Sequence, residues 1–306
     1  SHSCHLPDAR LAAKLGKGGL DMRTLIEALD QRVLLTDGSL ARQFQGADLD
    51  EKRDLFGTGD CYELLNLTRA RLVREVHEAY LRAGADVIRT NALAASPLSL
   101  ERQGCADQAF YINFAAAQIA CEAVDSVPGR GRRRFVLGVI RDHGWDLPPR
   151  EVEEAVAMQA EGLLAGGVDG LALDLVPGTG RARIFLRGAR RARENLSSSV
   201  PVFLHSARGE TSFSPLNLEL SDGLIGFRPG KADGRWLEGA IEREGLNLLG
   251  GGASPRQTAV LDRLLRGVAE DNLRPLTAWH QQKGSADEVV PPSSTICLDP
   301  AMAEVH

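Results

Sequence analysis

The chain has 306 residues, of which 43% are hydrophobic and 25% are charged, and its formal net charge is −5. This composition is typical of a globular protein. It shows neither the basic excess of a nucleic-acid-binding protein nor an apolar run near the ~20 residues that span a bilayer. The N-terminus has no apolar core of a signal peptide, so we expect a cytoplasmic protein with no nucleic acid and no membrane as partner.

The five cysteines, at positions 4, 61, 105, 121 and 297, are scattered and form no Cys-x-x-Cys pair. In a cytoplasmic protein this pattern predicts free thiols. Composition also divides the chain into three parts. Residues 1–21 are predicted to be an N-terminal extension, and residues 22–276 to form the folded domain. Residues 277–306 are polar and contain the stretch VVPPSSTICLDP, which predicts an arm or tail.

Apolar strand patterns alternate with amphipathic helix patterns through the middle of the chain. The predicted strands cover residues 32–39, 86–93, 134–142, 169–177, 200–207, 222–230 and 246–252. The predicted helices cover residues 68–85, 107–124, 148–167, 180–195, 233–245 and 256–268. Thr68 and Ser254 are predicted to cap the first and last of these helices, and Gly84 is predicted to end the first.

Three segments share one design, in which a helix end and a glycine stop precede an almost unbroken apolar strand: residues 79–91, 161–174 and 238–251. Such strands are buried on both faces, as in parallel sheets covered by helices. Repeated βα units in a chain of this length predict an α/β fold, a TIM-type (β/α)8 barrel. A doubly wound open sheet is the alternative, but the loop after the first strand has no glycine-rich phosphate-binding pattern. Because only seven strands are predicted, the barrel is expected to be irregular or to lack one βα unit between residues 205 and 245.

Polar residues gather where the predicted strands end, which is where parallel barrels carry their chemistry. These strand ends contain Asp37, Arg89, Thr90, Asn91, Arg141, Asp142, His143, Asp174, His205, Arg208, Arg228 and glycines 250–252. Carboxylates that meet an amine, and arginines that meet a carboxylate, would suit a small zwitterionic ligand. Asp174 lies inside an apolar strand, where an unpaired carboxylate is costly, and this favours a functional role.

Most of these residues also have a purely structural alternative. Asp37 with Gly38 is typical of a turn, and Asn91 suits a loop cap. His143 and Arg228 suit exposed loops, and His205 suits a structural hydrogen bond at the end of a buried strand. The predicted acid or base groups are nevertheless His205 and His143. The predicted ligand contacts are Asp37, Thr90, Asn91, Asp174 and Arg228.

Residues 63–104, ELLNLTRARLVREVHEAYLRAGADVIRTNALAASPLSLERQG, resemble the homocysteine-binding module of the homocysteine S-methyltransferase family. The family includes cobalamin-dependent methionine synthase and betaine–homocysteine methyltransferase. The segments LLTDGSLARQ, GLLAGGVDGLALDLVP and GLNLLGGGASP are similar to further parts of that module. The resemblance covers residues 24–268, is strongest in the first two thirds, and implies a TIM-type barrel that binds homocysteine.

In the family that the chain resembles, three cysteine thiolates hold Zn²⁺, which activates the homocysteine thiol for attack on a methyl group. The two adjacent cysteines of that set align with Gly252 and Ala253, and the segment IGFRPG, which matches the third, has no cysteine. Asp174 aligns with a glutamate that holds the amino group of homocysteine, and Arg89 replaces another glutamate. The resemblance therefore implies that the zinc site is lost, and it indicates no other cofactor.

Two hypotheses follow from the resemblance. In the first, the chain is an enzyme that transfers a methyl group to or from a small amino-acid-like ligand without zinc. Asp37 and Asp174 would then bind an amine, and a metal held by Asp37, Asp174, His143 and His205 is a lesser alternative. In the second, the chain is a non-catalytic binding subunit, or a partner of a corrinoid- or pterin-dependent methyltransferase system. The methyl donor would be a corrinoid that a partner protein carries. The strand-end argument also predicts that Asp37, Asn91, Asp174 and His205 converge on one pocket.

Overall fold

The computed structural model describes residues 24–129, 131–175, 181–206, 221, 223–224, 228–229, 248–250 and 252–267. For residues 206, 223, 224, 228 and 229 it describes the backbone alone. The predicted extension (1–21), tail (277–306) and helix 233–245 lie outside these residues, so they stay predictions.

Eight strands are found in the described part of the chain: β1 (Leu34–Leu35), β2 (Val87–Arg89), β3 (Phe135–Arg141), β4 (Gly170–Leu175), β5 (Val202–Ser206), β6 (Gly223–Leu224), β7 (Arg228–Pro229) and β8 (Leu248–Gly250). One sheet has the order β2-β3-β4-β5-β6, and the other has the order β1-β8-β7. A parallel bridge between Thr36 and Val87 joins the two sheets. The strands therefore follow one another as β6-β5-β4-β3-β2-β1-β8-β7, so that successive strands of the chain lie side by side, as in a TIM-type barrel.

The single strand predicted at residues 222–230 is described in two short pieces, β6 and β7. β6 pairs with β5, whereas β7 pairs with β8. Only three residues, 225–227, separate the two pieces, which is too few for the crossover helix of a complete βα unit. The expectation of an irregular barrel that lacks one βα unit between residues 205 and 245 therefore stays a prediction.

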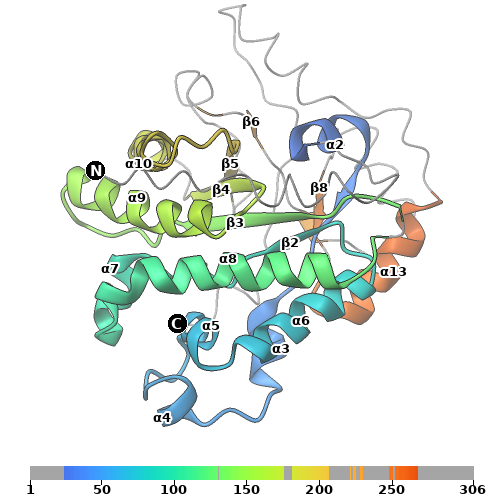
Figure 1. The fold of residues 1–306 in the computed structure, drawn as a ribbon, viewed down its shortest axis with the longest axis horizontal. Coiled ribbons are helices and arrows are strands. Elements are labelled where there is room, and N and C mark those ends of the chain that lie inside the picture. Colours follow the sequence, from blue (N-terminus) through green and yellow to red (C-terminus); the bar gives the residue numbers. More distant parts are fainter. Residues whose placement is uncertain are drawn as a thin grey trace, which may run out of the picture.

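Helices cover the strands on the outside of the barrel (Figure 1). The longer ones are α6 (Ala70–Arg82), α8 (Ala109–Ser126), α9 (Pro149–Ala165), α10 (Ala182–Asn195) and α13 (Pro255–Leu265). The shorter ones are α2 (Leu25–Gln31), α3 (Leu40–Gln45), α4 (Glu51–Asp54), α5 (Leu65–Thr68), α7 (Pro97–Leu100) and the 3-10 helices η1 (Tyr62–Leu64), η2 (Glu101–Gln103) and η3 (Ala106–Gln108). Helix α9 packs between α8 and α10, and α6 packs against α8 (Figure 1).

The ends of two helices test the predicted caps. The Ser254 hydroxyl accepts a hydrogen bond from the Gln257 N–H and begins α13, as predicted. The predicted cap at Thr68 is wrong, because this residue ends α5 and its hydroxyl donates to the Asp54 and Leu64 carbonyl oxygens. Helix α6 begins after the next residue without a side-chain cap. Gly84 follows the end of α6 with a φ of 114°, which is the predicted stop.

Alternate residues of the strands fill the inside of the barrel. On β3, Phe135, Leu137 and Val139 belong to this interior cluster, whereas Val136 and Ile140 pack outward against the helices. The other buried members of the interior cluster are Leu25, Ala28, Leu29, Leu34, Val87, Ala172, Phe203 and Leu248. The interior is therefore a packed core, as in other TIM-type barrels.

Helix α2 closes the amino-terminal end of the barrel. Its buried face contributes to the interior cluster, and a Cβ placed on Gly170, the first residue of β4, would lie 2.9 Å from a Leu25 methyl group. A capping box between Thr24 and Glu27 begins this helix. The predicted site residues consequently lie at the other, carboxyl-terminal end of the strands.

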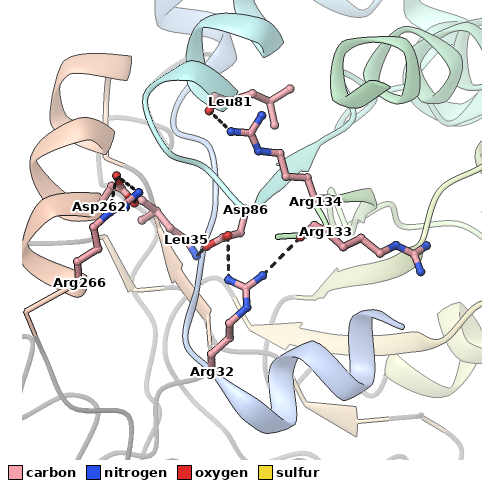
Figure 2. A network of polar contacts seen from close by, with 8 residues as sticks. All are labelled: Arg32, Leu35, Leu81, Asp86, Arg133, Arg134, Asp262 and Arg266. Carbon is pink, nitrogen blue, oxygen red and sulfur yellow. Dashed lines mark hydrogen bonds and ion pairs between the residues drawn. The ribbon is translucent and has the colours of Figure 1, made fainter. Parts of the chain in front are cut away.

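A buried ion pair ties the amino-terminal end together. Figure 2 shows the Arg32 guanidinium between the Asp86 carboxylate, at 2.8 Å, and the Arg133 carbonyl oxygen, at 3.4 Å. The second oxygen of Asp86 accepts a hydrogen bond from the Leu35 N–H at 3.1 Å. One aspartate thus links the loop before β1 to the start of β2.

The same arrangement recurs two βα units later, between β3 and β4. Asp169, directly before β4, accepts hydrogen bonds from Arg133 Nη2 at 2.9 Å and from the Val136 N–H at 2.8 Å. In both cases an arginine two residues before one strand pairs with an aspartate one residue before the next strand in space. Asp86 and Asp169 belong to two of the three repeated sequence segments, and they have the same structural role. Each pairs with an arginine and accepts a hydrogen bond from a strand N–H.

Candidate functional site

A charged row lies above the apolar interior, toward the carboxyl ends of the strands. On β3, β4 and β5, the inward residue that follows the apolar layer is Arg141, Asp174 and His205, respectively. Strand register places these three residues side by side, because Arg141 pairs with Asp174 and Asp174 pairs with His205. We call these three residues the charged row.

Asp174 lies between the two basic side chains of the row. Its Oδ2 accepts a hydrogen bond from Arg141 Nε at 2.8 Å, and its Oδ1 lies 2.9 Å from His205 Nδ1. Burial alone would raise the pKa of Asp174, but the charges and hydrogen bonds of His205 and Arg141 lower it to about 2. The carboxylate is therefore ionised at neutral pH, and Nδ1 of His205 carries the proton that it donates. In a neutral ring, Nε2 is then the basic nitrogen.

Asp37 forms a second buried pair, with Arg89. Its Oδ1 accepts a hydrogen bond from Arg89 Nε at 2.8 Å, and its Oδ2 accepts one from the Arg89 N–H at 3.0 Å. Arg89 Nη2 also donates to the Gly38 carbonyl oxygen at 2.8 Å. Burial raises the pKa of Asp37 above its ordinary value, and the charge and hydrogen bonds of Arg89 oppose that rise. Both oxygens of Asp37 and both oxygens of Asp174 are thus already bonded within the protein.

Buried amides fix the loop after β2. Asn66 of α5 donates to the Asn91 carbonyl oxygen at 2.7 Å, and Gln159 of α9 donates to the Ala92 carbonyl oxygen at 2.6 Å. The Asn91 side chain donates in turn to the Tyr62 carbonyl oxygen at 2.7 Å. The Asn91 side chain thus ties the loop after β2 to η1, and its predicted contact with a ligand stays a prediction.

Two further side chains complete this support. Asn113 of α8 donates to the Ala95 carbonyl oxygen at 2.7 Å, and the Ala94 N–H donates to Glu63 Oε1 at 2.8 Å. These residues and Gln159 were not predicted from the sequence. A polar side chain on the buried face of a helix was the one signal available, and it does not say which loop that side chain holds.

The remaining predicted site residues have different surroundings. Thr90 is buried, and its hydroxyl has no hydrogen-bond partner among the described residues. His143 is exposed, with Nε2 3.4 Å from the Leu93 carbonyl oxygen. Desolvation lowers the pKa of its ring, and the nearby charge of Asp174 opposes that shift. Arg228 lies on β7, and its side chain is not among the described atoms.

The structure brings some of the predicted residues together. Asp174 and His205 are in contact, whereas the contacts of Asp37 and Asn91 are with other residues. Convergence of all four on one pocket stays a prediction. In the described part of the chain, no three His, Cys, Asp or Glu side chains are gathered so that they could hold a metal ion, and the four-residue metal site considered above is not formed. Three of the cysteines predicted to be thiols, Cys61, Cys105 and Cys121, are buried and form no disulfide.

The loop after β8 packs tightly on the loop after β1. Gly252 has a φ of 78°, and a Cβ there would lie 2.8 Å from Gln257 Oε1. The Gly252 carbonyl oxygen accepts a hydrogen bond from the Ser39 N–H at 3.3 Å. A Cβ on Gly38 would lie 1.9 Å from that same oxygen. Both glycines are therefore needed for this close approach of two backbones.

Ala253 is held on both sides of its backbone. Its N–H donates to Gln257 Oε1 at 2.5 Å, and its carbonyl oxygen accepts a hydrogen bond from Gln43 Nε2 at 3.2 Å. Neither this residue nor Gly252 has a side chain that binds metal. The end of β8 is thus a packed loop without donors for a metal ion.

A family comparison gives this arrangement a context. The model that describes homocysteine S-methyltransferases matches residues 34–216 of the chain. The chain belongs to the homocysteine S-methyltransferase family. The resemblance noted in the sequence is thereby confirmed.

Curated relatives agree with this assignment. Methionine synthases from Mycobacterium tuberculosis and Mycobacterium leprae are each 30% identical to the chain over 213 residues, which is 67% of its length. The matched regions are 18% and 17% of those proteins, so the chain spans less than a fifth of these relatives.

Solved structures agree on the fold. The metallated form of the homocysteine methyltransferase MmuM from Escherichia coli matches 76% of this chain and 96% of its own, with a TM-score of 0.56 and 20% identity. The oxidized form of the same protein also has a TM-score of 0.56. At this identity the likeness shows the fold alone, and it confirms the TIM-type barrel. Among the described helices of this family member, none is long and apolar enough to cross a membrane.

The resemblance places Gly252 and Ala253 where the family carries adjacent zinc-binding cysteines, and this alignment stays a prediction, because the family model matches residues 34–216. The residues at these two positions do not fit such a site. They supply no thiolate, and a side chain at position 252 would require a left-handed backbone and displacement of Gln257.

Proposed function

We propose that this homocysteine S-methyltransferase family member binds a small, sulfur-containing, amino-acid-like ligand and transfers a methyl group to or from it without zinc. The loop after β8 supports the proposal most directly. Its glycine conformation and close packing match a loop that has no metal to hold. The buried charged row supports the retention of a polar site in the same barrel.

In the family, zinc would displace the proton of the ligand thiol. Without zinc, His205 of the charged row can accept that proton. With Asp174 ionised and Nδ1 of His205 protonated, Nε2 of His205 is the basic nitrogen. In the transfer to sulfur, a carbon–sulfur bond forms while the bond between the methyl carbon and its donor breaks. The thiol proton goes to His205. His143, the other predicted base, lies at the exposed rim of this site.

A non-catalytic binding subunit is the alternative function, in which the chain serves a corrinoid- or pterin-dependent methyltransferase. Methionine synthases are among the relatives of the chain, and a corrinoid-binding protein that carries the methyl donor is the partner that we propose for this alternative. The βα unit that is expected to be missing between residues 205 and 245 also favours it, because only three residues separate β6 from β7. We further propose a cytoplasmic protein with the barrel at residues 22–276 and with ligand contacts at Thr90 and Arg228.

Turnover in the presence of a metal chelator tests the enzymatic proposal. We expect methionine to form from homocysteine with a sulfonium or methylcorrinoid donor, as measured by mass spectrometry. His205→Gln is expected to slow this reaction by about 10²- to 10⁴-fold, the usual size of general acid–base catalysis. The Arg187→Gln variant, on the outer surface of α10, is the matched control with unchanged rate. Methionine formation that requires added zinc would contradict the proposal, and no turnover in either condition would favour the binding subunit.

A further inference from the structure

Three acid–arginine pairs at the carboxyl-terminal end of the barrel share one orientation. The carboxylates of Asp37, Asp174 and Asp142 are 0%, 2% and 0% exposed. Their partners Arg89, Arg141 and Arg181 are 17%, 21% and 15% exposed. In each pair the carboxylate is buried, and the guanidinium is partly exposed to solvent.

The arginine is also the more exposed partner in other ion pairs of the described residues, such as Arg133–Asp169 at the opposite end of the barrel, at 19% and 13%. The three strand-end pairs differ from the pairs at that end in the burial of their carboxylates. At the opposite end, Asp169 and Asp86 are 13% and 12% exposed. A ligand that approaches the strand ends through solvent meets guanidinium groups and no open carboxylate from these three pairs.

Arg141 is the arginine best placed to bind a ligand. It is the inward residue of β3 directly above the apolar interior, beside Asp174 and His205. Its Nε is bonded to Asp174, but no hydrogen bond from its two terminal nitrogens is found within the described residues. A guanidinium with both terminal nitrogens available suits the two oxygens of a carboxylate, which it binds in a bidentate manner.

We propose that the site selects its ligand by a carboxylate that Arg141 binds, and that it does not require an ammonium group. This inference rests on the proposed function, because it names the ligand class of the same site. It replaces the sequence-based expectation that Asp37 and Asp174 hold an amine. Both carboxylates have their oxygens bonded within the protein, so an ammonium group would have to displace Arg89, Arg141 or His205.

Three thiols that differ by one group test the inference by calorimetric titration of the full chain. Homocysteine has both charged groups, 4-mercaptobutanoate lacks the ammonium group, and 3-aminopropane-1-thiol lacks the carboxylate. We expect the first two to bind with dissociation constants within about threefold of each other, and the aminothiol to bind at least about tenfold more weakly. Arg141→Gln should weaken binding of 4-mercaptobutanoate by about 10- to 100-fold, and Arg141→Lys by less. Arg187→Gln, which removes an exposed guanidinium of α10, should leave it unchanged.

The outcomes separate this inference from the proposed function. Binding of homocysteine and the aminothiol without binding of 4-mercaptobutanoate would overturn the inference and leave the proposed function standing. Binding of none of the three would overturn both. The comparison of the three thiols uses the wild-type protein, so it decides the question even if the Arg141 variants do not fold.

Discussion

Replacing Asp174 with asparagine is expected to weaken ligand binding at the strand ends, because Arg141 loses the carboxylate that orients it, and to lower the free energy of unfolding by about 3 kcal/mol. The variant leaves two basic partners, Arg141 and His205, without the charge that both contact. It also removes the group that fixes the proton on Nδ1 of His205. Titration calorimetry and urea denaturation measure the two effects separately.

The stability effect of Asp174 should depend on pH. The pKa of the carboxyl group is lowered from 3.8 to about 2 in the folded protein. A lowered pKa stabilises the fold above the unfolded value, and that contribution is lost as the pH falls toward about 2. The difference between wild type and Asp174→Asn is thus expected to be full at pH 7 and to shrink between pH ~4 and pH ~2. A difference that stays constant across this range would contradict the ionised pair.

Replacing Asp86 with asparagine is expected to cost about 3–5 kcal/mol of unfolding free energy without changing ligand binding. The variant leaves the Arg32 guanidinium buried beside a neutral group, at the end of the barrel away from the strand-end site (Figure 2). It is therefore the matched control for Asp174→Asn, since both remove a buried carboxylate that pairs with an arginine. Loss of ligand binding in Asp86→Asn would show that binding responds to stability alone.

The second arginine–aspartate pair at this end of the barrel, Arg133–Asp169, allows the stability loss to be compared between pairs of different burial. Asp169→Asn should cost less, about 1–2 kcal/mol, because Arg133 is 19% exposed and can be hydrated when its partner is lost. Glu75→Gln, which breaks a surface pair with Arg71, should change stability by less than ~0.5 kcal/mol. Urea denaturation of the three variants measures the order. Equal losses in Asp86→Asn and Asp169→Asn would contradict the role assigned to burial.

Much of the barrel could be predicted because its strands are long enough to show a pattern. The strands β3 and β4 are apolar over six or seven residues, and the glycine-to-aspartate segments before β2 and β4 repeat visibly. The sequence predicted one strand where the structure describes β6 and β7, because pieces of two residues carry no periodicity of their own.

Residues of the site were predicted from the sequence, but the contacts between them were not. Asp174 and His205 were identified at the ends of apolar strands, and their contact depends on register that one sequence does not reveal. Arg141 was placed at a strand end without a role, although its position two residues after an inward valine puts it in the charged row. Gln159 could not be linked to the loop after β2, because its hydrogen bond joins residues 67 positions apart.

Zinc dependence of homocysteine binding is the measurement that tests the central claim most directly. Purified protein is titrated calorimetrically with homocysteine, once with a chelator and once with one equivalent of added zinc. The account predicts binding in both conditions, with dissociation constants within about threefold of each other. Binding that appears only with zinc would mean that other ligands rebuild the metal site, and it would contradict the account.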